Sequence, residues 1–302
     1  MLFRSVVFGS RCFARAASVC APAIVLIELT VVLLAPGVGE AQVGPVQLER
    51  SSEAAAIPIT VFHSPQSANL PTAATLKRGE LQFEISHRFL PAFSDGADVL
   101  WGLDGPAFNR LGLAFAFHDR GMVALQRSNL EDNLDLSVKF RLFEMGRESV
   151  PFMVAIVGGL AGNDAPQLPD GSTRPGQYYG QLILNAFLGN NVALGVVSSV
   201  LRNPRLDVPD AENAFSLGLT GQVYVSQRVS VLAEWNLSEE RPGLEHDAGS
   251  LGIELETGGH FFKILLTNAV RMNPAQFLGG TEFRFEPDEW RFGFNVTRLL
   301  HL

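Results

Sequence analysis

Apolar residues recur at every second position in about twelve short segments between Gly79 and Arg298. In the first segment, Leu81, Phe83 and Ile85 share one face of an extended strand, and the residues between them are polar or charged. A soluble sandwich also alternates, but its apolar faces need a partner sheet. A closed membrane barrel instead turns them to lipid and keeps a polar interior. The alternation is therefore compatible with two all-β folds, a soluble sandwich and a membrane barrel.

The alternation, together with the turn residues between segments, predicts twelve strands. Their ranges are 79–89, 109–118, 121–128, 133–143, 150–160, 177–187, 191–201, 214–224, 229–237, 249–257, 260–268 and 289–299. Residues 280–285 are an alternative further strand, so the count is uncertain by about two. An even number is typical of bacterial single-chain barrels.

The lengths of the connections separate the two folds. Those after the second, sixth, eighth and tenth predicted strands are tight, as at 118–120 and 258–259. Those after the first, fifth, seventh, ninth and eleventh are long and rich in Pro, Gly and Asp, as at 91–108, and residues 129–132 are the one short exception. This sorting is typical of short periplasmic turns and long external loops. The sequence therefore predicts an all-β protein, a single transmembrane antiparallel β-barrel of about 12 strands with both termini periplasmic.

The N-terminal region predicts export. Three arginines precede an apolar stretch over residues 21–35, and the small-residue site Gly39-Glu40-Ala41 follows it. A membrane anchor is the alternative, but Glu28 and Pro36 leave less than the roughly 18 to 20 apolar residues that a spanning helix needs. We therefore expect a signal peptide over 1–41, a periplasmic lead-in or partial plug over 42–78, and an outer-membrane barrel over 79–302. Such a protein has outer-membrane lipid and the barrel-assembly machinery as partners.

Charge and cysteine content exclude several classes of function. The formal net charge of -8 becomes more negative without the signal arginines, which argues against nucleic acid as a partner. Cys12 and Cys20 both precede residue 41, so the exported chain has neither a disulfide nor a thiolate metal site. The histidines are scattered, and no serine and histidine share a face at a convincing spacing. We expect no catalytic residue, no metal and no cofactor.

The predicted inner face carries charges of both signs. These residues are Glu80, Glu84, Arg88, Asp135, Lys139, Arg141, Glu254, Glu256, Lys263 and Arg291. In a partly desolvated interior such charges must pair or be hydrated. Two interpretations stay open: a structural salt-bridge network in a largely closed barrel, or a narrow channel whose charged rings set ion selectivity. Aromatic residues near the strand ends, among them Tyr178, Tyr179 and Trp235, are expected in the interfacial girdles.

Four stretches resemble an uncharacterised family of bacterial outer-membrane β-barrels, a domain of unknown function. They are GELQFEISHRF over 79–89, GLDGPAFNRLG over 102–112, ETGGH over 256–260 continuing to Leu266-Thr267-Asn268, and RFGFNVTR over 291–298. The resemblance covers nearly all of the chain from about Val61. It implies the barrel fold and the outer membrane, and it brings no reaction or binding residue with it.

The polar inner face favours a small passive channel for small solutes. The main alternative is a non-conducting structural or partner-binding barrel that acts through its long external loops. An outer-membrane hydrolase is the third possibility, because a fold by itself does not decide function.

Overall fold

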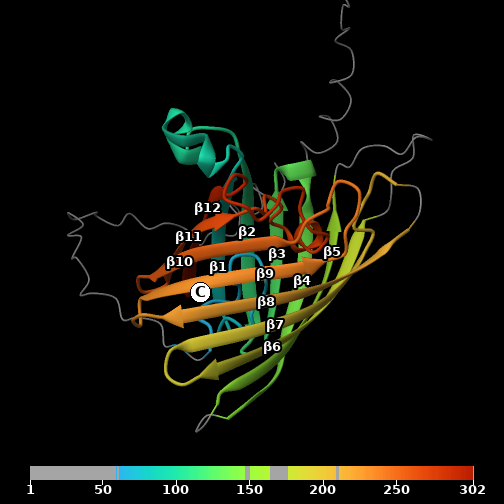
Figure 1. Ribbon diagram of the computed structural model, residues 1–302. Coiled ribbons are helices and arrows are strands. Elements are labelled where there is room, and N and C mark those ends of the chain that lie inside the picture. The colour runs from blue at the N-terminus through green and yellow to red at the C-terminus, as the bar shows by residue number, and fades with distance from the viewer. Residues whose placement is uncertain (1–58, 60, 147–149, 164–175, 209–210, 302) are drawn as a thin grey trace, which may run out of the picture. The chain divides into compact units, whose positions relative to one another are not determined.

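The computed structural model describes residues 59, 61–146, 150–163, 176–208 and 211–301. Twelve antiparallel strands form a closed barrel in which each strand pairs with its neighbours in sequence and β1 pairs with β12 (Figure 1). The strands are β1 Glu80–Phe89, β2 Ala107–His118, β3 Gly121–Ser128, β4 Leu134–Met145, β5 Phe152–Gly162, β6 Gln177–Leu188, β7 Val192–Arg202, β8 Asn213–Tyr224, β9 Val229–Ser238, β10 Ala248–Glu256, β11 His260–Thr267 and β12 Arg291–His301.

The predicted barrel and its strand count are confirmed. Each observed strand overlaps one predicted range, for example Gln177–Leu188 against the predicted 177–187. Residues 280–285 form no strand, and Thr281 makes only an isolated bridge to His246. Among the described residues, no helix is long and apolar enough to cross a membrane. The predicted signal peptide lies outside the described residues.

The connections differ in length between the two ends of the barrel. At one end, tight turns join β2 to β3, β6 to β7, β8 to β9 and β10 to β11. At the other, the β1–β2 loop contains the 3₁₀ helix η1 Phe93–Gly102, and the β11–β12 loop contains the short helix α2 Pro274–Phe277. The β3–β4 connection is again the exception, because the short 3₁₀ helix η2 Leu130–Asp132 reverses the chain direction within a short loop. Glu131 (φ 57°) and Asp132 (φ 52°) adopt the left-handed conformation there.

The outer wall is apolar. Large side chains that alternate with buried ones remain exposed on it, including Phe215 (60% exposed) and Ile264 (62%). Exposing such side chains to water costs about 25 cal/mol for each Å² of apolar surface. A continuous belt of them is stable when lipid covers it.

Residues 61–76, which we call the plug segment, lie inside the barrel (Figure 1, blue). The segment folds back on itself, since Ser67 N donates to Leu70 O (2.8 Å) and Thr72 N donates to Pro65 O (3.0 Å). Its polar atoms bond to side chains of β1, β4, β6 and β8 through β12. Wall side chains alone fill a barrel of about eight strands, whereas a wider barrel leaves space in its lumen for water or for further chain.

The inner face carries an apolar cluster beside its charged residues. Inward residues of β5, β6 and β7, such as Met153, Ile183 and Val197, form this cluster with Phe62 and Leu70 of the plug segment and with residues of α2. The expectation of a polar inner face therefore fails on β5, whose inward side chains are apolar. The inner face of β6 stays largely polar, since Gln181 and Asn185 are buried there.

Candidate functional site: the plugged lumen

Two buried lysines hold the plug segment to the wall. Lys139 Nζ on β4 donates to the backbone oxygens of Pro65 (2.6 Å), Thr72 (2.9 Å) and Ala74 (3.3 Å). An ammonium group has three donors and no acceptor, so this set uses all of them. No carboxylate of the described residues forms an ion pair with Lys139. The plug backbone is thus the counterpart of this buried charge.

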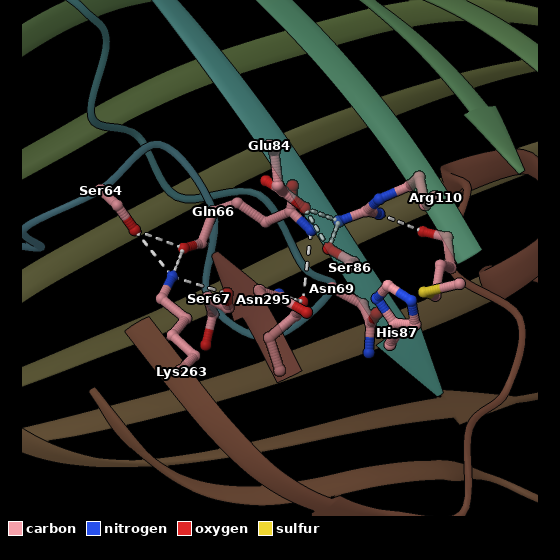
Figure 2. Close-up of polar contacts among 12 residues, drawn as sticks. Ser64, Gln66, Ser67, Asn69, Glu84, Ser86, His87, Arg110, Lys263 and Asn295 are labelled. Atoms are coloured by element: carbon pink, nitrogen blue, oxygen red, sulfur yellow. Dashed lines mark hydrogen bonds and ion pairs between the residues drawn. The ribbon is translucent and has the colours of Figure 1, made fainter. Parts of the chain in front are cut away.

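Lys263 on β11 binds only the first arm of the plug segment, residues 64–67. Figure 2 shows its Nζ directed at Ser64, Gln66 and Ser67. It donates to Ser64 Oγ (2.8 Å) and Ser67 O (2.9 Å), and its ammonium lies 3.3 Å from Glu254 Oε2. Both lysines are less than a tenth exposed. Charges buried in this way persist only when they are fully hydrogen-bonded.

The tip of the plug segment binds a carboxylate on the opposite side of the lumen. Glu234 on β9 accepts from Asn69 N (2.9 Å to Oε2) and from Leu70 N (2.8 Å). Arg88 on β1 donates to Asn69 Oδ1 (3.0 Å) and to Asn295 Oδ1 (2.8 Å). Both charged residues are buried. The tip is therefore positioned by one anion and one cation from distant strands.

Arg110 on β2 links the wall to the long β11–β12 loop. Its guanidinium pairs with Glu84 and donates to the backbone oxygen of Met272, as Figure 2 shows for Glu84. Asn273 beside it donates to Asn133 Oδ1 (2.6 Å). Met272 and Asn273 are fully buried, so this loop folds into the barrel rather than away from it.

A third cluster joins the start of the plug segment to β8 and β10. His63 Nδ1 lies 3.1 Å from Glu254 Oε1, and its backbone N–H donates to the hydroxyl of Tyr224 (2.9 Å). Gln222 Nε2 also donates to Glu254 (2.7 Å). Because Lys263 contacts the same carboxylate, Glu254 and Lys263 together hold the first arm of the plug segment, residues 63–67, to the wall.

A small polar cavity remains between the plug segment and the wall. Its volume is ≈ 70 Å³, and Gln82, Gln126, Ser137 and Gln181 lie among its lining residues. The side-chain oxygens of Gln82 and Gln126 are buried without a hydrogen-bond partner among the described residues. Buried amide oxygens of this kind are ordinarily satisfied by ordered water. The lumen on this side is suited to water.

Six of the ten predicted inner-face charges lie in the lumen. They are Glu84, Arg88, Asp135, Lys139, Glu254 and Lys263, all buried. Each has a hydrogen-bond or ion-pair partner from the plug segment or the wall, and that of Asp135 is the hydroxyl of Tyr179 (2.7 Å). Tyr179 therefore faces inward and is not part of the expected aromatic girdle, whereas its neighbour Tyr178 is exposed.

The other four lie at the ends of the barrel. Glu80 accepts from Lys77 N (2.8 Å), and Glu256 accepts from Gly259 N (2.9 Å), both at the short-turn end. Arg141 also differs from the expectation. Its strand position points inward, but β4 is irregular between Arg141 and Phe143, and the guanidinium reaches Glu144 at the rim.

Arg291 is the fourth, at the loop end. Its guanidinium donates to Leu90 O (3.0 Å) and covers the ring of Phe283. Arg110 was missing from the predicted set, although it shares the strand face of Gly112 and Ala114. The parity of its strand would have identified it. The plug residues His63 and Asn69 carry no comparable signal in the sequence.

A closed barrel with a lipid-facing belt and a filled lumen defines a membrane-bound β-barrel protein. Residues 62–300 match the family described as membrane bound beta barrel domain (DUF5777), and the chain belongs to that family. The resemblance to an outer-membrane β-barrel family of unknown function is thus confirmed at the level of the family. A comparison with curated proteins finds no match.

Several solved structures are similar to the chain at low identity. A KdgM porin is 9% identical with a TM-score of 0.46, covering 74% of this chain and 99% of that one. A NanC porin is 8% identical with a TM-score of 0.47, covering 74% and 99%. An outer membrane channel from Pseudomonas putida F1 is 11% identical with a TM-score of 0.48, covering 76% and 98%.

Proposed function

We propose that the protein is an outer-membrane channel for small polar solutes and that the plug segment closes it in the described state. The observation that carries the proposal is the set of buried charges that bind the plug backbone, above all Lys139, Lys263 and Glu234. Apolar residues would fill a permanently closed lumen at least as stably, because replacing buried charges with well-packed apolar groups is often neutral or stabilising. Charges on the wall become useful when the plug segment moves and water replaces it.

The asymmetry of the lumen supports the same conclusion. The apolar cluster on β5 to β7 packs against the plug segment and α2, whereas Lys139, Glu234 and Lys263 hold the plug by hydrogen bonds. A shift of the plug segment toward the apolar cluster opens a path past the cavity that Gln82 and Gln126 line. Rings of charged side chains then set which solutes pass.

A reversible lock tests the proposal directly. Ser67 Oγ on the plug and Thr220 Oγ1 on β8 lie 3.0 Å apart, and residues 42–302 contain no cysteine. Sulfur atoms at these two positions would be close enough to bond, since an S–S bond is about 2.05 Å long. We expect the Ser67→Cys/Thr220→Cys protein to stay silent in a planar bilayer when oxidised and to conduct intermittently after reduction.

The unsubstituted protein treated with the same reductant is the control, and its conductance should not change. Equal conductance of the oxidised and reduced double variant would show that solutes do not need plug movement. Silence of both forms, together with silence of the Lys139→Met/Arg110→Met double variant, would show that the barrel is not a channel. A heat-modifiable gel shift confirms folding in every sample.

A further inference from the structure

A groove of ≈ 570 Å³ lies on the outer wall at the short-turn ends of β2, β4 and β5. We call it the rim groove. Its floor is apolar and consists of Phe117, Phe140, Leu142 and Ile156, each between 40 and 44% exposed. The rings of Phe117 and Phe140 meet edge to face with centroids 5.6 Å apart. The floor is continuous with the lipid-facing belt of the barrel.

Three basic side chains form the edge of the rim groove. They are His118, Arg120 and Arg141. No described residue accepts a hydrogen bond from the Arg120 guanidinium, whereas Arg141 Nε is buried without a partner. His118 Nδ1 accepts from Arg120 N (3.1 Å), so the neutral ring carries its proton on Nε2, where it is free to donate. Arg120 and His118 thus place N–H donors without an acceptor side by side.

The rim groove is lined by two arginines and by no carboxylate, although the whole chain is acidic. Arg141 already uses part of its guanidinium, since it donates to Asp119 O (3.1 Å) and lies 3.4 Å from Glu144 Oε2. Arg120 therefore provides the strongest unused donor.

We propose that the rim groove binds an anionic phospholipid, with its phosphate on Arg120 and His118, next to the charge of Arg141, and an acyl chain along the apolar floor. The short-turn end of such barrels faces the periplasm. The donors lie where the apolar wall ends, which is the level of the headgroups. Guanidinium groups match the geometry of a phosphate, and basic pockets at this level suit headgroups with negative charge.

Native mass spectrometry of the refolded protein in detergent tests this proposal. We titrate phosphatidylglycerol and, in parallel, phosphatidylcholine, which has a similar size and no net charge. We expect one phosphatidylglycerol to be retained per protein and phosphatidylcholine to bind more weakly. Arg120→Gln should weaken phosphatidylglycerol binding about tenfold, the loss of roughly one charge-assisted contact. Arg120→Lys should give an intermediate value.

Arg228→Gln is the matched control, because Arg228 lies in the β8–β9 turn at the same end of the barrel but away from the rim groove. It should bind phosphatidylglycerol as the unsubstituted protein does. Equal affinity for the two lipids would overturn the proposal, and so would equal effects of Arg120→Gln and Arg228→Gln. Displacement of the lipid by millimolar inorganic phosphate would assign the donors to a soluble anion instead.

Discussion

Replacing Lys139 with methionine should loosen the plug segment while leaving the barrel wall intact. The side chain keeps its length, but it loses three hydrogen bonds to Pro65 O, Thr72 O and Ala74 O. The β4 backbone ladders to β3 and β5 do not involve Nζ, so the barrel itself should fold. The effect should therefore appear in plug docking rather than in strand pairing.

The magnitude follows from those three bonds. A hydrogen bond to a charged group contributes about 1.5 to 3 kcal/mol, and the substitution also removes the cost of desolvating an ammonium. The net loss of docking free energy is then on the order of 2 to 5 kcal/mol. At about 1.4 kcal/mol per factor of ten, the undocked population rises roughly 30-fold to several thousand-fold.

Cysteine labelling measures this population. Ala68 at the plug tip is fully buried, so Ala68→Cys reacts with a membrane-impermeant maleimide only when the plug segment leaves its site. We expect Lys139→Met to raise the labelling rate at least 30-fold, in line with the lower estimate of lost docking. Arg127→Met on β3 is the control, since it removes an exposed cation that pairs with Asp132. Equal labelling rates in the two variants would refute the docking role of Lys139.

Three further predictions concern the wall, the plug tip and the external loop. Tyr179→Phe removes the hydroxyl that donates to buried Asp135 (2.7 Å). The free energy of unfolding should fall by about 1 to 3 kcal/mol, measured as loss of the folded gel band in a urea titration. Leu70→Ala, at a fully buried position, should speed labelling at the plug tip, because such truncations cost about 2 to 5 kcal/mol. The backbone N–H of Arg284 donates to Glu289 and lowers the pKa of that carboxyl, so the loop contact should hold above the ordinary pKa of 4.5 and weaken as pH falls below it. This pH dependence is measured by acid-protease cleavage of the loop at stepped pH, with Glu289→Gln as the pH-insensitive comparison.

Strand positions and loop order could be predicted because both depend on local rules. A two-residue period places Glu84 and Arg88 on one face, and the structure buries both. Turn residues set where each strand ends, so the tight connections, such as 258–259, are visible in the sequence. Such signals require only the residues of one strand and its turn.

The contacts of the plug and the apolar cluster of the lumen could not be predicted, although a partial plug was one of the two interpretations of residues 42–78, because these contacts depend on distant partners. Asn69 and Glu234 are 165 positions apart, and nothing in the polar, proline-broken segment around Asn69 specifies that contact. Inward apolar residues of β5 to β7, such as Ile183, pack against the plug segment and α2. Alternation in a membrane barrel leads one to expect polar side chains on the inner face, so it gives no sign of this cluster.

Two segments close the lumen, and a buried arginine holds each of them. The plug tip binds Arg88, while the β11–β12 loop binds Arg110 through Met272 O, and Glu84 pairs with Arg110. Moving the plug alone leaves the inward-folded loop in place. Full opening therefore requires both segments to move. A ligand that favours opening must bind more tightly to the open arrangement than to the closed one. We therefore expect Arg110→Met to raise the conductance of plug-loosened Lys139→Met. Equal conductance of the single and double variants would show that the loop does not obstruct the path.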